Sequence, residues 1–210
     1  MEIKRKIFLA LGFLLLAFCQ TREKDTLQPA DEDLLTKPLD NITGADLKKM
    51  RVLVQTDFGN FVIAFYPEKA PALVKNFIRL VRQGFYEGLY FHMVVPRYMV
   101  IAGDPKGDGS GGPGYWLKPE YNDLPHNRGA VGYSHPPFQP DQIGSQFYVM
   151  LTDYGRNTNA YPVFGYVENG MEVLDRIGEI PSSGISAKPP WQPTIQIKIR
   201  NMKLMTAGNK

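Results

Sequence analysis

Short runs in which apolar and polar side chains alternate constrain this fold more than any other feature of the sequence. The run RVLVQTDFGNFVIAFYP, residues 51–67, alternates on both sides of the turn signal DFGN, which predicts a β-hairpin. Near the end of the chain, TIQIKIRNMKL places Ile195, Ile197 and Ile199 on one side of a strand and polar residues on the other. A chain built from such runs needs a sheet with one buried face.

Two stretches have helical spacing instead. Residues 70–88, APALVKNFIRLVRQGFYEG, have Pro71 near their start, apolar residues at helical intervals and Gly84 as a stop signal. A shorter helix is expected at GMEVLDRIG, residues 170–178, and further strands at residues 90–103 and 129–167. The 20 Gly and 17 Pro residues favour short strands joined by turns. This order predicts a mainly β fold, a closed antiparallel barrel capped by two α-helices, because closure removes exposed strand edges.

The first nineteen residues have the pattern of an export signal. A basic start, MEIKRK, precedes the apolar run IFLALGFLLLAF and then Cys19. The run is shorter than the roughly 20 residues that a helix needs to cross a bilayer, so residues 1–19 are expected to be a signal peptide. The sequence LAFC resembles a lipoprotein cleavage box, with Phe18 where a small residue is usual, and predicts lipidation of Cys19. The alternatives are an uncleaved anchor and an ordinary buried cysteine.

The chain after Cys19 is polar, charged and contains proline, so residues 20–48 are expected to be a flexible tether. Residues 49–206 are expected to form the folded domain. Together these features predict an exported protein held at the bacterial cell envelope, periplasmic or surface-facing, by a lipid anchor on Cys19. We expect a monomer, and since Cys19 is the only cysteine, no intramolecular disulfide can form.

Charge and motif spacing exclude several classes of ligand. A formal net charge of +3, mixed along the chain, argues against nucleic acid as a partner. The glycine stretch GDGSGG, residues 107–112, is followed by PGYW and not by a helix, so it predicts a surface loop and not a dinucleotide site. His92, His126 and His135 are scattered and lack metal-ligand spacing. We therefore expect neither a metal nor a cofactor.

Aromatic and sulfur-containing side chains gather near the ends of the expected strands, at Phe91, Met93, Tyr98, Met99, Phe147, Tyr148 and Tyr161. Many of them must belong to the core. Phe147 and Tyr148 cannot both point inward from a regular strand, so one of the two is expected on the outer face. An aromatic surface there commonly binds a flat apolar group such as a proline ring.

Five segments occur in an order and at a spacing that resemble the cyclophilin-type peptidyl-prolyl isomerases, particularly the bacterial members. They are YFHMVVPRYMVIAGD, GDGSGGPGY, HNRGAVGYS, GSQFYV and YPVFGYV. The resemblance covers about residues 51–204. It implies an eight-stranded antiparallel barrel with two capping helices, and a reaction, rotation of the peptide bond that precedes proline. That reaction needs no cofactor and no nucleophile.

The resemblance also implies which residues carry the reaction, and here the chain departs from the family. His92 matches the family's histidine, and Gln146 matches its substrate-holding glutamine. Met93 stands where the family has an arginine that donates to the substrate amide, and Ile101 replaces the glutamine that steadies this arginine. Because Met93 and Ile101 are both apolar, neither position leaves a buried polar group without a hydrogen-bond partner. Since the arginine's hydrogen bond to the substrate amide is missing, isomerase activity is expected to be weakened.

The remaining implied contacts with substrate form the proline pocket and the strand beside it. They are Tyr98, Met99, Ile101, Ser134, His135, Phe147, Tyr148, Asn157 and Tyr161. Arg97 or Arg128 could supply a substitute donor for the absent arginine.

The sequence thus predicts a prolyl isomerase that assists the folding of cell-envelope proteins, with proline-containing peptides or unfolded proteins as partners. Two alternatives stay open. The chain could be a non-catalytic proline-peptide binding module or holdase chaperone, or a structural lipoprotein that kept the barrel.

Overall fold

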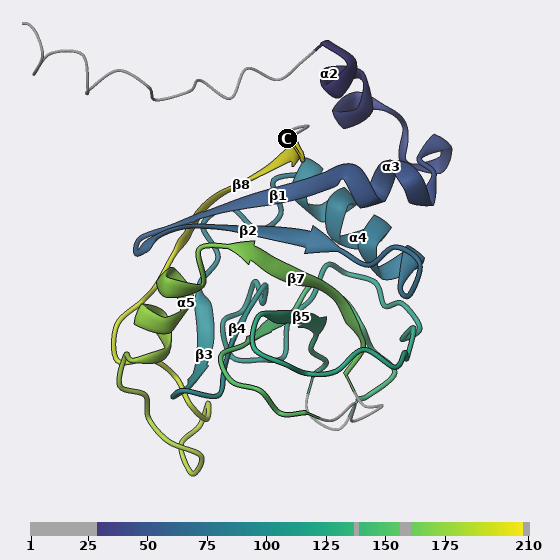
Figure 1. The fold of residues 1–210 in the computed structure, drawn as a ribbon. Helices are drawn as coiled ribbons and strands as arrows, with labels where there is room; N and C mark the ends of the chain where they lie inside the picture. The colour runs from purple at the N-terminus through teal and green to yellow at the C-terminus, as the bar shows by residue number, and fades with distance from the viewer. Residues whose placement is uncertain (1–28, 137–138, 156–160, 208–210) are drawn as a thin grey trace, which may run out of the picture.

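The computed structural model describes residues 29–136, 139–155 and 161–207, and its strands form one antiparallel sheet (Figure 1). The sheet has eight strands in the order β3-β4-β6-β5-β7-β2-β1-β8. The strands are β1 (Met50–Thr56), β2 (Gly59–Phe65), β3 (Phe91–Val95), β4 (Met99–Ala102), β5 (Ala130–Tyr133), β6 (Phe147–Met150), β7 (Val163–Asn169) and β8 (Ile199–Thr206). Eight antiparallel strands were expected, and this prediction is confirmed.

The sheet does not close into a continuous barrel. β3 and β8 are its two ends, and no strand ladder joins them. They are joined by an isolated bridge between Tyr90 and Lys198 and by backbone hydrogen bonds around it, such as the one of 3.0 Å from Phe91 N to Ile197 O and the one of 2.8 Å from Ile199 N to Leu89 O. β8 begins at Ile199, and Ile195, expected on the buried face of this strand, is 51% exposed. The prediction of a closed barrel is therefore correct for the strands and wrong for the closure.

Two helices cover the barrel, as the spacing of apolar residues predicts. α4 (Pro71–Arg82) begins with proline in its first turn and buries Leu73, Val74, Phe77, Ile78 and Val81 against the sheet. α5 (Met171–Gly178) lies on the opposite side of the barrel in Figure 1 and buries Val173, Leu174 and Ile177. Each helix packs its apolar face against the sheet, and this face would otherwise be exposed to water.

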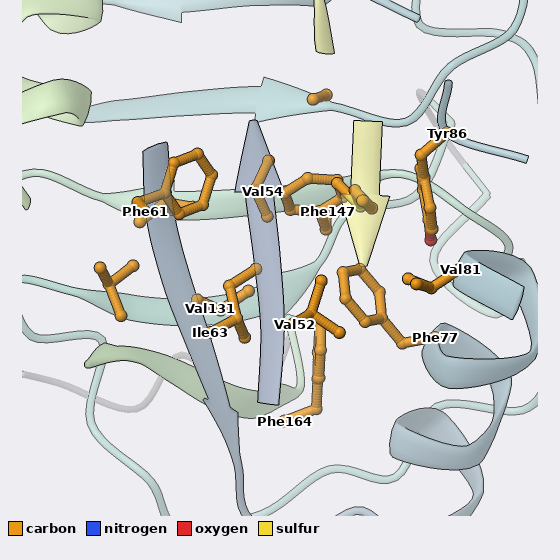
Figure 2. Packing of buried hydrophobic residues seen from close by; sticks show 14 of the residues in the cluster. Val52, Val54, Phe61, Ile63, Phe77, Val81, Tyr86, Val131, Phe147 and Phe164 are labelled. Carbon is orange, nitrogen blue, oxygen red and sulfur yellow. The ribbon is translucent and has the colours of Figure 1, made fainter. Parts of the chain in front are cut away.

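The core is built from the inward side chains of the sheet and from α4 (Figure 2). Val52 and Val54 on β1 are fully buried, as the alternation of the first hairpin requires. Phe77 of α4 lies among aromatic rings of the strands, with its centroid 5.0 Å from that of Phe164 and 5.4 Å from that of Phe147. Phe147 therefore points into the barrel, and its neighbour Tyr148 belongs to a separate apolar cluster.

The segment before the barrel is helical where a flexible tether was expected. It holds α2 (Pro29–Thr36), the 3-10 turn η2 (Leu39–Asn41) and α3 (Gly44–Lys49), which is capped by Thr43 and Asp46. Ile42 and Leu47 are buried in the main core, and Nη1 of Arg82 donates to the carbonyl of Lys37 at 2.7 Å. These contacts tie residues 34–49 to α4 and the sheet, so the segment is part of the folded unit.

The expected signal peptide, Cys19 and residues 20–28 of the expected tether lie outside the described residues. Within the described ranges, no helix combines the length and the apolar character needed to cross a membrane.

Candidate functional site

Four residues directly opposite one another form a row across neighbouring strands. Met93 of β3 faces Ile101 of β4, Ile101 faces Tyr148 of β6, and Tyr148 faces Gly132 of β5. Met93, Ile101 and Tyr148 pack in one apolar cluster that is separate from the main core. Met93 and Ile101, the positions where the resemblance implies an arginine and a glutamine, are thus direct cross-strand neighbours, and both side chains are apolar.

Tyr148 lies across the surface of the sheet and covers Gly132. A Cβ atom on residue 132 would come 2.2 Å from the phenol oxygen of Tyr148, so only glycine leaves room for this ring. The hydroxyl group donates to the carbonyl of Tyr161 over a long 3.4 Å. Burial raises the pKa of Tyr148 well above its usual range, so the phenol stays neutral. The expectation that one member of the Phe147–Tyr148 pair faces outward is confirmed.

Aromatic rings border the apolar cluster of Met93, Ile101 and Tyr148. Tyr98 and Tyr154 meet edge to face with centroids 6.1 Å apart, and Tyr161 stands edge to face with Tyr148 at 6.3 Å. His135 stacks on Tyr161 with centroids 4.7 Å apart and rings parallel within 1°. Burial, and then the neighbouring phenols of Tyr154 and Tyr161, raise the pKa of Tyr98. Together with the half-buried Met99, these rings form an aromatic surface of the kind that holds a proline ring.

His126 belongs to this site, although no motif in the sequence identifies it as a site residue. Its ring stacks on Tyr148 with centroids 5.9 Å apart, and its Nε2 lies 2.9 Å from the carbonyl of Tyr161. A carbonyl only accepts hydrogen bonds, so Nε2 carries the proton. A single histidine in the loop LPHNRG has no spacing signal, and only the approach of residues 126, 148 and 161 in space identifies it.

The polar end of the site is occupied by Gln146 and His92. Gln146 is 3% exposed, and its side-chain amide donates to the carbonyls of Gly109 and Gly111, both at 2.9 Å. His92 is 5% exposed and lies close to Gln146. Burial lowers the pKa of His92, against the opposing effect of Asp104 and Asp108. His92 and Gln146 thus lie close together, and the side-chain amide of Gln146 binds the glycine loop.

The other site residues named from the sequence are distributed around this surface. The backbone N–H of Ser134 donates to the carbonyl of Gln146 at 2.9 Å, and Nδ1 of His135 donates to the carbonyl of Pro136 at 2.9 Å. Phe147 lies in the barrel core and does not reach the surface. Asn157 lies outside the described residues.

Two arginines, Arg97 and Arg128, lie near this surface in the sequence and could act as substitute donors. The guanidinium of Arg128 binds both carboxylate oxygens of Asp175, at 2.7 and 2.6 Å, and the carbonyl of Leu151 at 2.7 Å. This pairing raises the pKa of Arg128. Arg97 is exposed in the turn between β3 and β4, with a left-handed φ of 57°. Arg128 is therefore a structural residue that joins the loop before β5 to α5.

The described residues hold no group of three or more His, Cys, Asp or Glu side chains that could bind a metal ion. The site consists of an apolar, aromatic surface beside one buried polar pair.

Comparison with known proteins matches most of this chain to one family. Residues 51–204 match the family described as "Cyclophilin type peptidyl-prolyl cis-trans isomerase/CLD". A peptidyl-prolyl cis-trans isomerase of Helicobacter pylori is 36% identical over 128 residues, which are 59% of this chain and 77% of the relative. The peptidyl-prolyl cis-trans isomerase B of Bacillus subtilis is 41% identical over 107 residues, 51% of this chain and 75% of the relative.

A longer match extends over 163 residues of a peptidyl-prolyl cis-trans isomerase-like 1 protein of Emericella nidulans, with 32% identity, covering 76% of this chain and 97% of the relative. Among solved structures, a cyclophilin-type isomerase of Cryptosporidium parvum, crystallised in the presence of the dipeptide Ala-Pro, superposes with a TM-score of 0.66. Its sequence is 25% identical, and the match covers 76% of this chain and 99% of that one. The chain belongs to the cyclophilin-type peptidyl-prolyl cis-trans isomerase family.

Proposed function

We propose that this protein is a slow prolyl isomerase that binds proline-containing segments of unfolded proteins on its aromatic surface. The observation that carries this proposal is the cross-strand pair of Met93 and Ile101, which makes the centre of the site apolar. Rotation about a peptide bond before proline has a barrier of about 18–20 kcal/mol in water. A site that buries the twisted amide in apolar surroundings still favours it over the planar forms, because loss of conjugation also reduces the polarity of the amide.

The proposed weakness follows from the missing donor. A hydrogen bond from a charged group contributes about 1.5–3 kcal/mol, so its absence reduces the rate by roughly ten- to more than a hundredfold. Arg128 does not replace it, because its guanidinium is bound to Asp175 and Leu151. No bound cofactor enters this mechanism.

The direct test is a protease-free isomerisation assay on the full-length protein and on the Met93→Arg/Ile101→Gln variant. We expect low but measurable turnover of an Ala-Pro peptide by the natural protein, and a gain of at least about tenfold in the variant. Ile185→Arg adds the same charge at a residue that is 74% exposed and serves as the control. Rapid turnover by the natural protein, with no gain in the variant, would refute the proposed role of the missing pair.

The second candidate is a non-catalytic proline-peptide binding module or holdase chaperone. The apolar row of Met93, Ile101 and Tyr148 favours it, since such a row can hold a proline ring without polarising the amide. Saturable binding of an Ala-Pro peptide with no turnover above the spontaneous rate would support this candidate. The absence of both binding and turnover would leave a structural role for the barrel.

The proposed place of action is the bacterial cell envelope, with folding of envelope proteins as the task. Support comes from the sequence alone, namely the basic and apolar start of the chain and Cys19. Metabolic labelling with a fatty acid tests the lipid anchor, and Cys19→Ala should abolish both the label and membrane association. Sedimentation of the protein tests the proposed monomer.

A further inference from the structure

A buried hydrogen-bond network inside the barrel is centred on Asn76 of α4. Asn76 is 1% exposed, and its Nδ2 atom donates to the hydroxyl oxygen of Tyr133 at 3.0 Å and to the carbonyl oxygen of Gly144 at 2.9 Å. Its Oδ1 atom accepts a hydrogen bond of 2.6 Å from the hydroxyl group of Tyr115. Both N–H bonds of the amide and its oxygen are therefore used inside the protein.

The partners of Asn76 fix the orientation of its amide. The carbonyl oxygen of Gly144 can only accept, so the amide nitrogen faces it. The hydroxyl group of Tyr133 donates its one proton to the carbonyl oxygen of Leu73 at 3.3 Å, so it accepts from Asn76. The hydroxyl group of Tyr115 then donates to the remaining Oδ1. A flipped amide would place its oxygen against the carbonyl of Gly144, so the network fits only one orientation.

Two partners of Asn76 lie in segments that border the candidate site. Tyr115 follows the glycine loop, residues 107–112, by three residues. Gly144 precedes Gln146 by two residues, and the side chain of Gln146 binds the loop. One buried amide therefore joins the segment that leaves the glycine loop to the segment that leads to Gln146.

Further hydrogen bonds fix the segment before β6 to its surroundings. Backbone bonds pair it with the chain after the glycine loop, from Leu117 N to Ile143 O at 2.8 Å and from Ile143 N to Leu117 O at 3.3 Å. In the interior, Oγ of Ser145 donates to the carbonyl of Gly103 at 2.6 Å, and the hydroxyl group of Tyr86 donates to the carbonyl of Ser145 at 3.2 Å. The residues on both sides of Gly144 are thus held as well, so a local change at the Asn76 amide has a defined frame against which it can be measured.

We infer that Asn76 is a positioning residue of the substrate site. Its amide fixes, from beneath the surface, the segments that hold Gln146 and the end of the glycine loop. A shift at Gly144 would move Gln146 and the loop carbonyls together, because the side chain of Gln146 binds them. The effect on substrate rests on the proposed function. Asn76 acts through these residues and not by contact with substrate, since it is 1% exposed.

Tyr115→Phe tests this inference with the smallest change. It removes one hydroxyl group and leaves Oδ1 of Asn76 without its donor, while the half-buried ring stays. Asn76→Leu would leave the carbonyl of Gly144 and two hydroxyl groups without their partner in the interior, and is expected to unfold the domain. Tyr121→Phe removes a hydroxyl group from a tyrosine that is 45% exposed in the same connecting segment, and serves as the control.

Hydrogen exchange measures the positioning without reference to activity. The N–H of Leu117, bonded to Ile143, reports on the paired segments, and the N–H of Gly129, bonded to Met150, reports on another part of the barrel. In the full-length protein, Tyr115→Phe should speed exchange at Leu117 about tenfold and change exchange at Gly129 less than about twofold. Equal acceleration at both N–H groups, or none at Leu117, would overturn the inference.

Peptide binding and kinetics test the effect on the site. Tyr115→Phe should raise the dissociation constant of an Ala-Pro peptide and KM about three- to tenfold, and change kcat less than about twofold. The reason is that a displaced surface weakens the binding of ground state and transition state alike. Tyr121→Phe should leave all three constants unchanged. A fall in kcat at constant KM, or unchanged binding, would contradict positioning.

A double-mutant cycle tests the route through Gln146. In a Gln146→Ala background, Tyr115→Phe should no longer change the peptide dissociation constant, because the glycine loop is already released. Additive effects of the two substitutions would refute this route. If the natural protein neither binds nor isomerises the peptide, the proposed function fails, whereas the exchange experiment still decides whether Asn76 positions these segments.

Discussion

Gly132 lies beneath the ring of Tyr148, so close that a Cβ atom at residue 132 would meet the phenol oxygen at 2.2 Å and ring carbons at 2.4 and 2.5 Å. The obstructing atoms belong to a ring that is 3% exposed and packed by His126, so they have little room to move. The absence of one side chain on β5 thus shapes the aromatic surface on β6.

Gly132→Ala should therefore damage the pocket and the fold together. We expect the free energy of unfolding to fall by about 1–3 kcal/mol, because the added methyl group overpacks the site. Affinity for an Ala-Pro peptide should fall as Tyr148 is displaced. Urea unfolding and peptide titration measure the two effects. Gly44→Ala adds the same methyl group where no atom lies within 4 Å, and should leave both unchanged.

Leu47→Ala should show that the segment before the barrel belongs to the folded unit. Leu47 is 1% exposed within the main core, and truncating such a leucine costs about 2–5 kcal/mol. Ile185→Ala, at a residue that is 74% exposed, should change stability by less than about 0.5 kcal/mol. Chemical unfolding of both variants gives the comparison. Equal stabilities would mean that residues 34–49 act as a tether after all.

The Arg128→Ala variant tests whether Arg128 has a structural role or a catalytic one. Its partner Asp175 is 41% exposed, so the pair contributes about 1 kcal/mol or less to stability. We expect a small loss of stability and an unchanged kcat/KM, because the guanidinium is bound to Asp175 and Leu151. A tenfold fall in kcat/KM, with the fold intact, would instead identify Arg128 as the substitute donor.

Acid should weaken the fold through His92. Burial lowers the pKa of His92 below its ordinary value of 6.5. Just below pH 6.5, His92 is therefore protonated in the unfolded chain but still neutral in the folded protein. The free energy of unfolding should thus decrease as the pH falls below about 6.5, until the folded protein also takes up the proton. His92→Gln should reduce this slope, measured by urea unfolding between about pH 7.5 and 5. An unchanged slope would show that other groups cause the acid sensitivity. His135→Gln, at a half-exposed histidine, is the control.

The local pattern of apolar and polar residues was sufficient to predict most helices and strands. It was not sufficient for segments that are buried by residues distant in the sequence. The first hairpin and α4 follow directly from alternation and helical spacing. The segment around α3 was expected to be flexible because its few apolar residues have no regular period. Ile42 and Leu47 become buried only because the barrel offers them a surface. The gap between β3 and β8 was missed for a related reason, since alternation at Ile195 does not guarantee a partner strand.

The sequence by itself determined the strand-rich fold, the family and the loss of the arginine–glutamine pair, because each depends on residue types and their spacing along the chain. Only the tertiary structure decided that Met93 and Ile101 are cross-strand neighbours, that His126 supports Tyr148, and that Gln146 holds the glycine loop. These contacts join residues far apart in the sequence, and the spacing of residues along the chain does not reveal them. The physical reason is that hydrogen bonds and ring contacts depend on distances in space, which packing of the whole barrel sets.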